Sequence, residues 1–333
     1  MKKKVLLIAT GGTIASKKSE NGLTPLIKAE EILSYIPRVY EFCDPSAVQI
    51  CNIDSTNMEP KHWKLIVETI RENYEAYDGF VIAHGTDTMA YTAAGLSYMI
   101  QNSAKPIVLT GAQKSIDLEI TDAKTNLLDS FRYASDEKSQ GVQMVFGGRV
   151  IAGTRAKKVR SKSYNAFESI DYPALAMIQD SRIMRYIEPV PFQEPVIFYE
   201  EMNENIFLMK LIPGISPKGL QFFFEQYDGI IIESFGVGGI PASIADVFYE
   251  LYEKYPEKVI IMATQVAHEG SDMTVYEVGN KIKKDCRILE SYDMTLEAVI
   301  AKTMWMLGGN NRGKLRIEEA FYKKINYDLV FEP

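Results

Sequence analysis

The chain has 333 residues, 46% of them apolar, so it is long enough for one large domain or two unequal ones. Its 37 basic and 44 acidic residues give a net charge of −7, which argues against nucleic acid or a membrane surface as an electrostatic partner. No stretch approaches the roughly 20 apolar residues of a membrane span, and the scattered Cys43, Cys51 and Cys286 are more typical of reduced thiols in a cytoplasm than of a disulfide framework.

The first apolar run of the chain ends in a glycine turn. Val5–Ala9 is continuously apolar, which predicts a strand buried on both faces of a sheet. Gly11 and Gly12 follow and allow a tight turn and the close approach of another segment. Thr10 and Thr13 flank them at the carboxyl end of the strand, where open α/β sheets bind ligands. The alternative is an ordinary turn whose threonines bond their own backbone.

The rest of the first half alternates short apolar strands with amphipathic helices. The polar segment 16–28 predicts a mobile loop rather than a helix or strand. Further strands are predicted at Val48–Ile53, Gly79–Ala83, Pro106–Thr110 and Val142–Phe146. Helices are predicted at Ala29–Ile36, from Pro60, from Met89 and at Thr121–Ala134. This order predicts an α/β fold with a right-handed, doubly wound and mostly parallel sheet.

Prolines between residues 173 and 195 mark the passage to a second, smaller α/β domain. We place the first domain at residues 1–190, a linker at 191–205 and the second domain at 206–333. Its predicted strands are Ile206–Ile212, Gly229–Ile232, Val259–Ala263 and Arg287–Leu289, and its predicted helices are Lys218–Gln226, Ala242–Tyr255 and Thr295–Leu307.

Three polar clusters, 10–13, 54–57 and 86–87, terminate predicted parallel strands and should converge on one crevice. A threonine there can act as a nucleophile in acyl transfer if a base takes its proton, and a lysine of lowered pKa can be that base. Ser55 and Thr56 suit an α-carboxylate, and Asp87 suits an α-ammonium. Ser55, Thr56 and Asp87 could instead cap the helices that follow them.

Five motifs follow one another along the chain: Thr10-Gly11-Gly12-Thr13-Ile14-Ala15, Asn52-Ile53-Asp54-Ser55-Thr56, His84-Gly85-Thr86-Asp87-Thr88-Met89, Leu109-Thr110-Gly111-Ala112-Gln113 and Gly236-Val237-Gly238-Gly239. Together they resemble the motifs of the bacterial-type L-asparaginases, specifically the cytoplasmic type I group. The resemblance covers nearly the whole chain.

The resemblance implies hydrolysis of L-asparagine to L-aspartate and ammonia through a covalent acyl-enzyme, without a metal or organic cofactor. It makes Thr13 the nucleophile and Thr86, Asp87 and Lys158 a second catalytic group, with Lys157 as the alternative lysine. The substrate-binding residues that it implies are Asp54, Ser55, Thr56, Thr86 and Asp87. It also implies a homo-oligomer, a dimer or a tetramer of intimate dimers, in which Glu277 could be lent to a neighbouring subunit.

The chain departs from the family pattern at two places. Family members commonly carry a tyrosine in the loop over the nucleophile, whereas here Leu23 occupies that position, so the base for Thr13 stays open. Gly239 stands where many relatives have an asparagine.

Two other functions compete with hydrolysis. The first is the asparaginase-like subunit of a tRNA-dependent amidotransferase, which is expected to carry an extra amino-terminal domain, whereas Val5 begins the catalytic fold directly. The second is a non-catalytic amino-acid- or nucleotide-binding protein, although the third glycine of a dinucleotide fingerprint does not follow Gly12.

Overall fold

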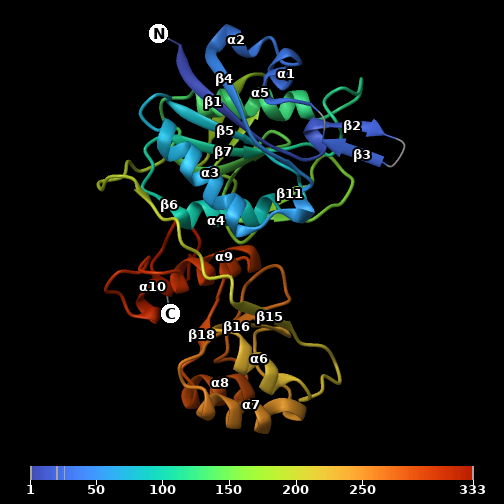
Figure 1. Ribbon diagram of the computed structural model, residues 1–333. Coiled ribbons are helices and arrows are strands. Elements are labelled where there is room, and N and C mark those ends of the chain that lie inside the picture. Colours follow the sequence, from blue (N-terminus) through green and yellow to red (C-terminus); the bar gives the residue numbers. More distant parts are fainter. Residues whose placement is uncertain (1, 20–21, 26, 332–333) are drawn as a thin grey trace. The chain divides into compact units, whose positions relative to one another are not determined.

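The computed structural model describes residues 2–19, 22–25 and 27–331. The chain divides into two α/β units (Figure 1). The first unit comprises Met1–Glu200 together with Ile325–Tyr327, and the second comprises Glu201–Lys324 and Asp328–Pro333. The division after Glu200 falls within the segment that the sequence marks as a linker.

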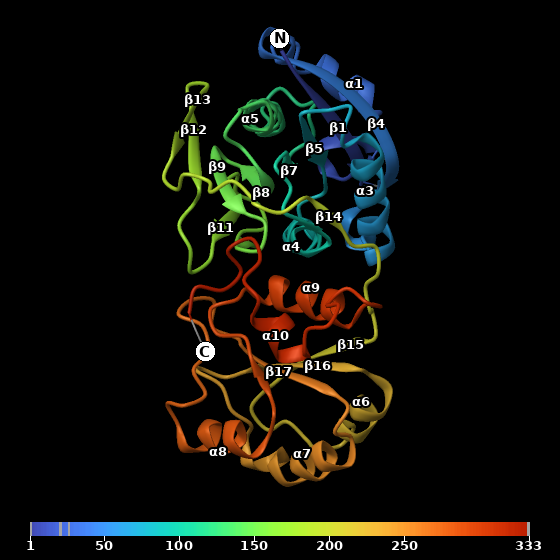
Figure 2. The ribbon, with the colours of Figure 1, turned by 90° about the vertical axis from the view of Figure 1, so that its left-hand side faces the viewer.

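The first unit contains an eight-stranded sheet with the order β13-β12-β9-β8-β7-β5-β1-β4 (Figure 2). Its parallel strands are β1 (Lys3–Gly11), β4 (Cys43–Ile53), β5 (Gly79–Ala83), β7 (Pro106–Thr110) and β8 (Gly141–Phe146). An antiparallel edge adds β9 (Arg149–Ala152), β12 (Ala176–Gln179) and β13 (Arg182–Arg185). The predicted α/β fold with a mostly parallel sheet is therefore confirmed.

Helices cover both faces of this sheet. On one face lie α1 (Ala29–Ser34), α2 (Val39–Phe42) and α5 (Ala123–Ala134), and on the other lie α3 (Pro60–Asn73) and α4 (Met89–Met99) (Figure 1). Val5, Leu7 and Ala9 join the hydrophobic cluster under α1 and α5. Leu6 and Ile8 alternate with them and are equally buried, because side chains of a strand point to opposite faces. This double burial explains why the strand is apolar throughout.

Short elements complete the first unit. Two single-turn helices, η1 (Thr13–Ala15) and η2 (Ser55–Asn57), follow β1 and β4. Two further strand pairs are β10 (Ala156–Lys158) with β11 (Phe167–Ser169), and β6 (Ile100–Gln101) with β14 (Ile197–Phe198).

The prediction of an unstructured loop at 16–28 is wrong. Strands β2 (Ser16–Ser19) and β3 (Gly22–Pro25) pair there as an antiparallel hairpin, with Lys18 opposite Leu23. The sequence Asn21-Gly22 is a strong hairpin signal, which the polar composition of the segment masks.

The second unit contains a four-stranded parallel sheet, β15 (Ile206–Lys210), β16 (Gly229–Ser234), β17 (Val259–Thr264) and β18 (Leu289–Glu290). Its helices are α6 (Leu220–Gln226), α7 (Ala242–Lys254), α8 (Glu277–Asp285), α9 (Leu296–Leu307) and α10 (Ile317–Tyr322). Helices α8 and α10 are additions to the predicted set. In the part of the chain that the structure describes, every helix is too short or too polar to cross a membrane.

Candidate active site

Glycines bring the ends of β1, β4 and β5 into direct backbone contact. Gly11 and Gly12 have φ angles of 106° and 76°, which side chains of L-residues rarely allow. A Cβ on Gly12 would lie 2.4 Å from the Gly85 backbone after β5, and one on Gly11 would lie 2.6 Å from the Ile53 backbone of β4. The Gly12 N–H also donates to the Ile53 carbonyl at 2.9 Å. The three predicted clusters therefore meet at one edge of the sheet.

The two threonines of the glycine turn have different surroundings. The Thr10 hydroxyl is buried and donates to the Ala83 carbonyl at 3.0 Å, so this threonine joins β1 to β5. Thr13 begins η1 and is only partly buried. Within residues 2–19, 22–25 and 27–331, no hydrogen bond engages its hydroxyl. Among the described residues neither threonine hydroxyl bonds the backbone of its own turn, so the ordinary-turn alternative is not observed, and the Thr13 hydroxyl is available to a ligand.

The cluster at the end of β4 is ordered by its own side chains. One carboxylate oxygen of Asp54 accepts from the backbone N–H and from the hydroxyl of Thr56, each at 2.9 Å. Ser55 is buried, and its Oγ accepts from the backbone N–H of Asp87 at 3.3 Å. Neither Ser55 nor Thr56 caps α3, because Glu59 holds that position and its N–H donates to His62 Nδ1 at 3.0 Å. The capping alternative therefore fails for both residues.

Asp87 does not cap the helix that follows it either. The N-cap position of α4 is Thr88, whose hydroxyl donates to the Ser55 carbonyl at 2.7 Å. The Asp87 side chain remains 60% exposed. Its carboxylate is therefore available to partners other than the helix, and Lys158 is one of them.

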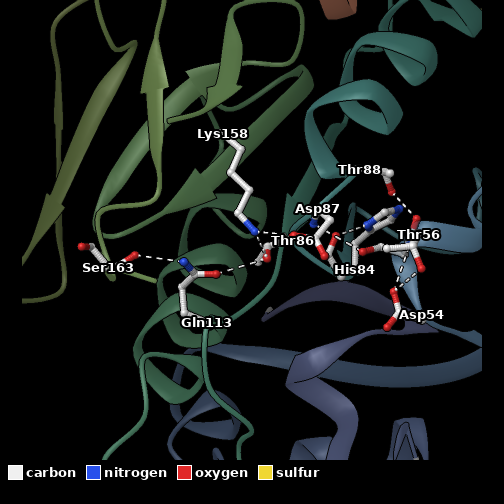
Figure 3. Close-up of polar contacts among 11 residues, drawn as sticks. Asp54, Thr56, His84, Thr86, Asp87, Thr88, Gln113, Lys158 and Ser163 are labelled. Carbon is white, nitrogen blue, oxygen red and sulfur yellow. Dashed lines mark hydrogen bonds and ion pairs between the residues drawn. The ribbon is translucent and has the colours of Figure 1, made fainter. Parts of the chain in front are cut away.

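Lys158 supplies the main charged contact of the site (Figure 3). Its Nζ donates to the Thr86 hydroxyl at 2.8 Å and to the Asp87 carboxylate at 2.6 Å, and its side chain is only 17% exposed. Lys158 comes from β10, where it follows Lys157. Successive side chains of a strand point to opposite faces, so only one of the two lysines can point toward Thr86.

A glutamine to which the sequence analysis assigned no role completes this network. The Thr86 hydroxyl donates to Gln113 Oε1 at 3.2 Å, and Gln113 Nε2 donates to the Ser163 carbonyl at 3.1 Å (Figure 3). The Asp122 carboxylate accepts from the backbone N–H groups of Gln113 and Lys114 at 2.9 and 3.1 Å. Gln113 follows β7 just as the predicted clusters follow their strands, and that position was the signal that could have found it.

Comparison with known proteins assigns both units. Residues 4–191 match the family described as "Asparaginase, N-terminal", and residues 205–321 match "Glutaminase/Asparaginase C-terminal domain". The chain belongs to the asparaginase family.

Relatives within this family are named either as L-asparaginases or as subunits of a glutamyl-tRNA(Gln) amidotransferase. The chain is 38% identical to an L-asparaginase of Thermococcus kodakarensis over 92% of its own length and 93% of that protein. It is 34% identical to a glutamyl-tRNA(Gln) amidotransferase subunit of Pyrococcus abyssi, over 91% of this chain and 72% of the relative.

Solved asparaginase structures share the fold. The structure of the thermostable L-asparaginase from T. kodakarensis has a TM-score of 0.91 and 34% identity, and covers 99% of this chain and 100% of that one. L-asparaginase I from Vibrio cholerae has a TM-score of 0.85 and 27% identity, over the same shares of the two chains.

His84 lies beside the candidate site, but both of its ring nitrogens have partners within the protein. Its Nδ1 lies 2.7 Å from the Gly85 carbonyl, which can only accept, so Nδ1 carries the proton and Nε2 accepts from the Thr92 hydroxyl at 2.9 Å. Burial lowers the pKa of His84 to about 4. No group of three or more possible metal ligands occurs among the described residues.

Two residues that the sequence singled out, Glu277 and Leu23, take no part in the contacts described above. Glu277 is exposed as the first residue of α8 in the second unit, so its role toward a neighbouring subunit stays a prediction. Leu23 belongs to β3, and its side chain lies outside the described part of the chain.

Proposed function

We propose that this asparaginase family member hydrolyses L-asparagine to L-aspartate and ammonia through an acyl-enzyme on Thr13. The observation that carries the proposal is the double contact of Lys158 with Thr86 and Asp87, beside the glycine turn that presents Thr13. Such a group provides a nucleophile, a proton-transfer partner and a carboxylate at one edge of the sheet.

The reaction takes two steps in this proposal. Thr13 Oγ attacks the side-chain amide carbonyl and gives up its proton, the C–N bond breaks, and ammonia leaves with that proton. Water then attacks the resulting ester, aspartate departs, and the Thr13 oxygen regains a proton. Splitting one difficult acyl transfer into two easier ones is the advantage of a covalent intermediate.

The amino-acid end of the substrate has suitable partners. An ionised carboxylate has about four acceptor sites, so Asp87 can hold an α-ammonium while it accepts from Lys158. The Ser55 oxygen accepts from the Asp87 backbone, which leaves its own proton for the α-carboxylate. We assign Thr56 to the same carboxylate, with Asp54 orienting the Thr56 hydroxyl.

We place the base for Thr13 on the Lys158 side of the site. The hydroxyls of the β2–β3 hairpin are poor proton acceptors near neutral pH, and its lysines are protonated in water. Thr86, in the loop after β5, and Lys158, in β10, form a hydrogen-bonded pair at the carboxyl edge of the sheet. The sheet edge is therefore the better location for proton transfer.

Ammonia release from purified protein, given L-asparagine, L-glutamine or buffer alone, tests this function. We expect asparagine to be preferred by about 100-fold, because the longer glutamine amide is misplaced when the α-groups are fixed. Thr13→Ala should bind L-aspartate yet release no ammonia, while Thr13→Ser, which keeps a hydroxyl, should retain turnover. Release by Thr13→Ala near the parent rate would exclude Thr13 as the nucleophile.

The second candidate is a subunit of a tRNA-dependent amidotransferase, which the 34% identity to the P. abyssi relative favours. The two candidate functions predict different activities for the purified chain without partner proteins. A free hydrolase should turn over asparagine with a kcat in the usual range of roughly 1–10³ s⁻¹. Binding of L-aspartate without turnover of free asparagine would instead favour the amidotransferase role.

We also propose a cytoplasmic homo-oligomer. All three cysteines are free thiols, which fits a reducing compartment. Val275, Tyr276 and Val278 flank Glu277 and are 55%, 64% and 56% exposed, which is an apolar surface suited to a second copy of the chain. Light scattering of the purified protein should give a dimer or tetramer mass, and a monomer at working concentration would contradict the proposal.

A further inference from the structure

A cavity of about 250 Å³ lies on the outer face of α5 in the first unit. Thr125, Leu128, Asp129 and Arg132 face it from α5, at the i, i+3, i+4 and i+7 spacing of one helix face. Its other walls are Arg38 and Phe42 on the side of α2, Ile178 of β12, and Asp180 and Ser181 in the β12–β13 turn. Figure 2 shows α5 beside the β12–β13 hairpin. None of these residues belongs to the site around Thr13.

Arg132 is held in this cavity by an aromatic ring. The carbon at the centre of its guanidinium lies 4.3 Å from the centre of the Phe42 ring, a cation–π contact that does not use its N–H donors. Among the described residues, no hydrogen bond or ion pair engages that guanidinium. Its donors are therefore available to an anionic group.

Asp129 faces the same cavity and is also without a hydrogen bond or ion pair within the described residues. It is partly buried, and burial raises the pKa of its carboxyl to about 6, against the opposing effect of Arg132. A desolvated carboxylate without a partner is unfavourable, and a ligand that donates to it removes that cost. The other charged groups that line the cavity are Arg38 and Asp180.

We propose that this cavity binds a free α-amino acid with a small apolar side chain. Asp129 accepts from the ligand's ammonium, Arg132 donates to its carboxylate, and Leu128 and Ile178 contact its side chain. The two unpaired groups have opposite charge and lie in one cavity, which a zwitterion satisfies at once. A simple anion would leave Asp129 unpaired, and a simple cation would be repelled by the arginines.

The size of the cavity agrees with this ligand class. Pockets for drug-sized ligands usually span about 300–1,000 Å³, so a cavity of about 250 Å³ suits a smaller molecule. Three apolar side chains, Phe42, Leu128 and Ile178, line this cavity beside its charged groups, whereas the partners around Thr13 are hydroxyls and charges. Amino-acid binding here does not depend on whether the chain is a hydrolase.

Calorimetric titration of the full chain with L-valine tests the proposal. Saturable binding is expected, both alone and with saturating L-aspartate present to occupy the site at Thr13. Isobutylamine and isovalerate each lack one of the two charged groups and should bind at least about 10-fold more weakly. Equal binding of isovalerate and L-valine would make the cavity an anion site and overturn the proposal.

Matched variants locate the bound amino acid. Asp129→Asn and Arg132→Gln should each weaken L-valine binding about 10-fold or more. Lys124→Gln changes an exposed charge on the same helix outside the cavity and should leave binding unchanged. Circular dichroism should show all three variants folded, since Asp129→Asn preserves shape and removes only an unpaired charge. No binding of L-valine to the parent chain, or unchanged binding in both cavity variants, would overturn the proposal.

Discussion

Burial decides the role of His84. The residue follows β5 directly and stands next to Gly85 and Thr86, so its position alone would suit a catalytic base. It is however fully buried, and the Thr92 hydroxyl that faces its ring also accepts from Trp63 Nε1 at 2.9 Å. A neutral imidazole satisfies these contacts, whereas a protonated one would place an uncompensated charge in the core. His84 therefore supports the loop that carries Thr86.

This histidine should make the fold sensitive to acid. Its pKa is about 4 when folded and near 6.5 in the unfolded chain, so between these values the unfolded state binds the extra proton. The stabilisation from His84 is complete above pH 6.5 and is lost as pH falls toward 4, by roughly 3 kcal/mol. The measurement is the free energy of unfolding in urea between pH 4 and 7.

His84→Gln should flatten this pH dependence, because glutamine does not titrate. His268→Gln, which changes an exposed histidine, is the matched control and should keep the parent's slope. An unchanged slope in His84→Gln would show that other groups cause the acid sensitivity.

Buried strands are the elements that the sequence predicts best. The bounds of β5 and β7 agree with prediction, because both are apolar on both faces and begin at a glycine or a proline. The β2–β3 hairpin escapes prediction because its sequence is polar. Helix α8 escapes prediction because few of its residues are buried. Only Gly279 and Ile282 of α8 are buried, so its apolar face is too small to show a helical period.

In the candidate site, residues at the ends of strands could be predicted from the sequence, whereas contacts between loops could not. The convergence of strand ends follows from parallel topology, so the sequence could place Thr13, Ser55 and Asp87 at one edge of the sheet. The contact of Thr86 with Gln113 joins two loops, and loops carry no periodicity from which a pairing can be read. Lys158 comes from a three-residue strand outside the main sheet, and only the family resemblance selected it.

Whether β10 or the β2–β3 hairpin supplies the base can be decided by two variants. Lys158→Met keeps the apolar stem but cannot take a proton, so it should abolish acylation. Leu23→Ala should mainly raise KM, because a leucine can cover substrate and exclude water but cannot accept a proton. Single-turnover ammonia release measures the acylation step in each variant.

Lys157→Met is the control for the loss of a positive charge on β10 and should acylate near the parent rate. The assignment to β10 fails if Lys158→Met acylates normally. It also fails if Leu23→Ala slows acylation as severely as Thr13→Ala.

At the scale of the whole chain, Ile325–Tyr327, near the carboxyl end, support the strand that carries Lys158. Ile325–Tyr327 belongs to the first unit although the chain around it belongs to the second. The backbone carbonyl of Asn326 accepts from the Thr154 hydroxyl at 2.6 Å, and the carbonyl of Tyr327 accepts from Arg155 Nε at 2.6 Å. Both donors directly precede β10, and Arg155 is fully buried. The position of Lys158 thus depends on residues about 170 positions later in the chain.

Asn326→Gly should therefore weaken both the fold and the catalysis. The Asn326 amide donates to Ser97 Oγ and to the Val142 carbonyl, each at 2.8 Å, and glycine loses both bonds while it accepts the φ of 49° without strain. We expect the free energy of unfolding to fall by roughly 1–3 kcal/mol and kcat for asparagine to fall because β10 is less firmly held. Asn310→Gly, at an exposed asparagine of the second unit, shares the backbone entropy change and serves as the control in urea unfolding and ammonia-release assays. Equal stability and kcat in the two variants would show that the carboxyl-terminal segment does not support β10.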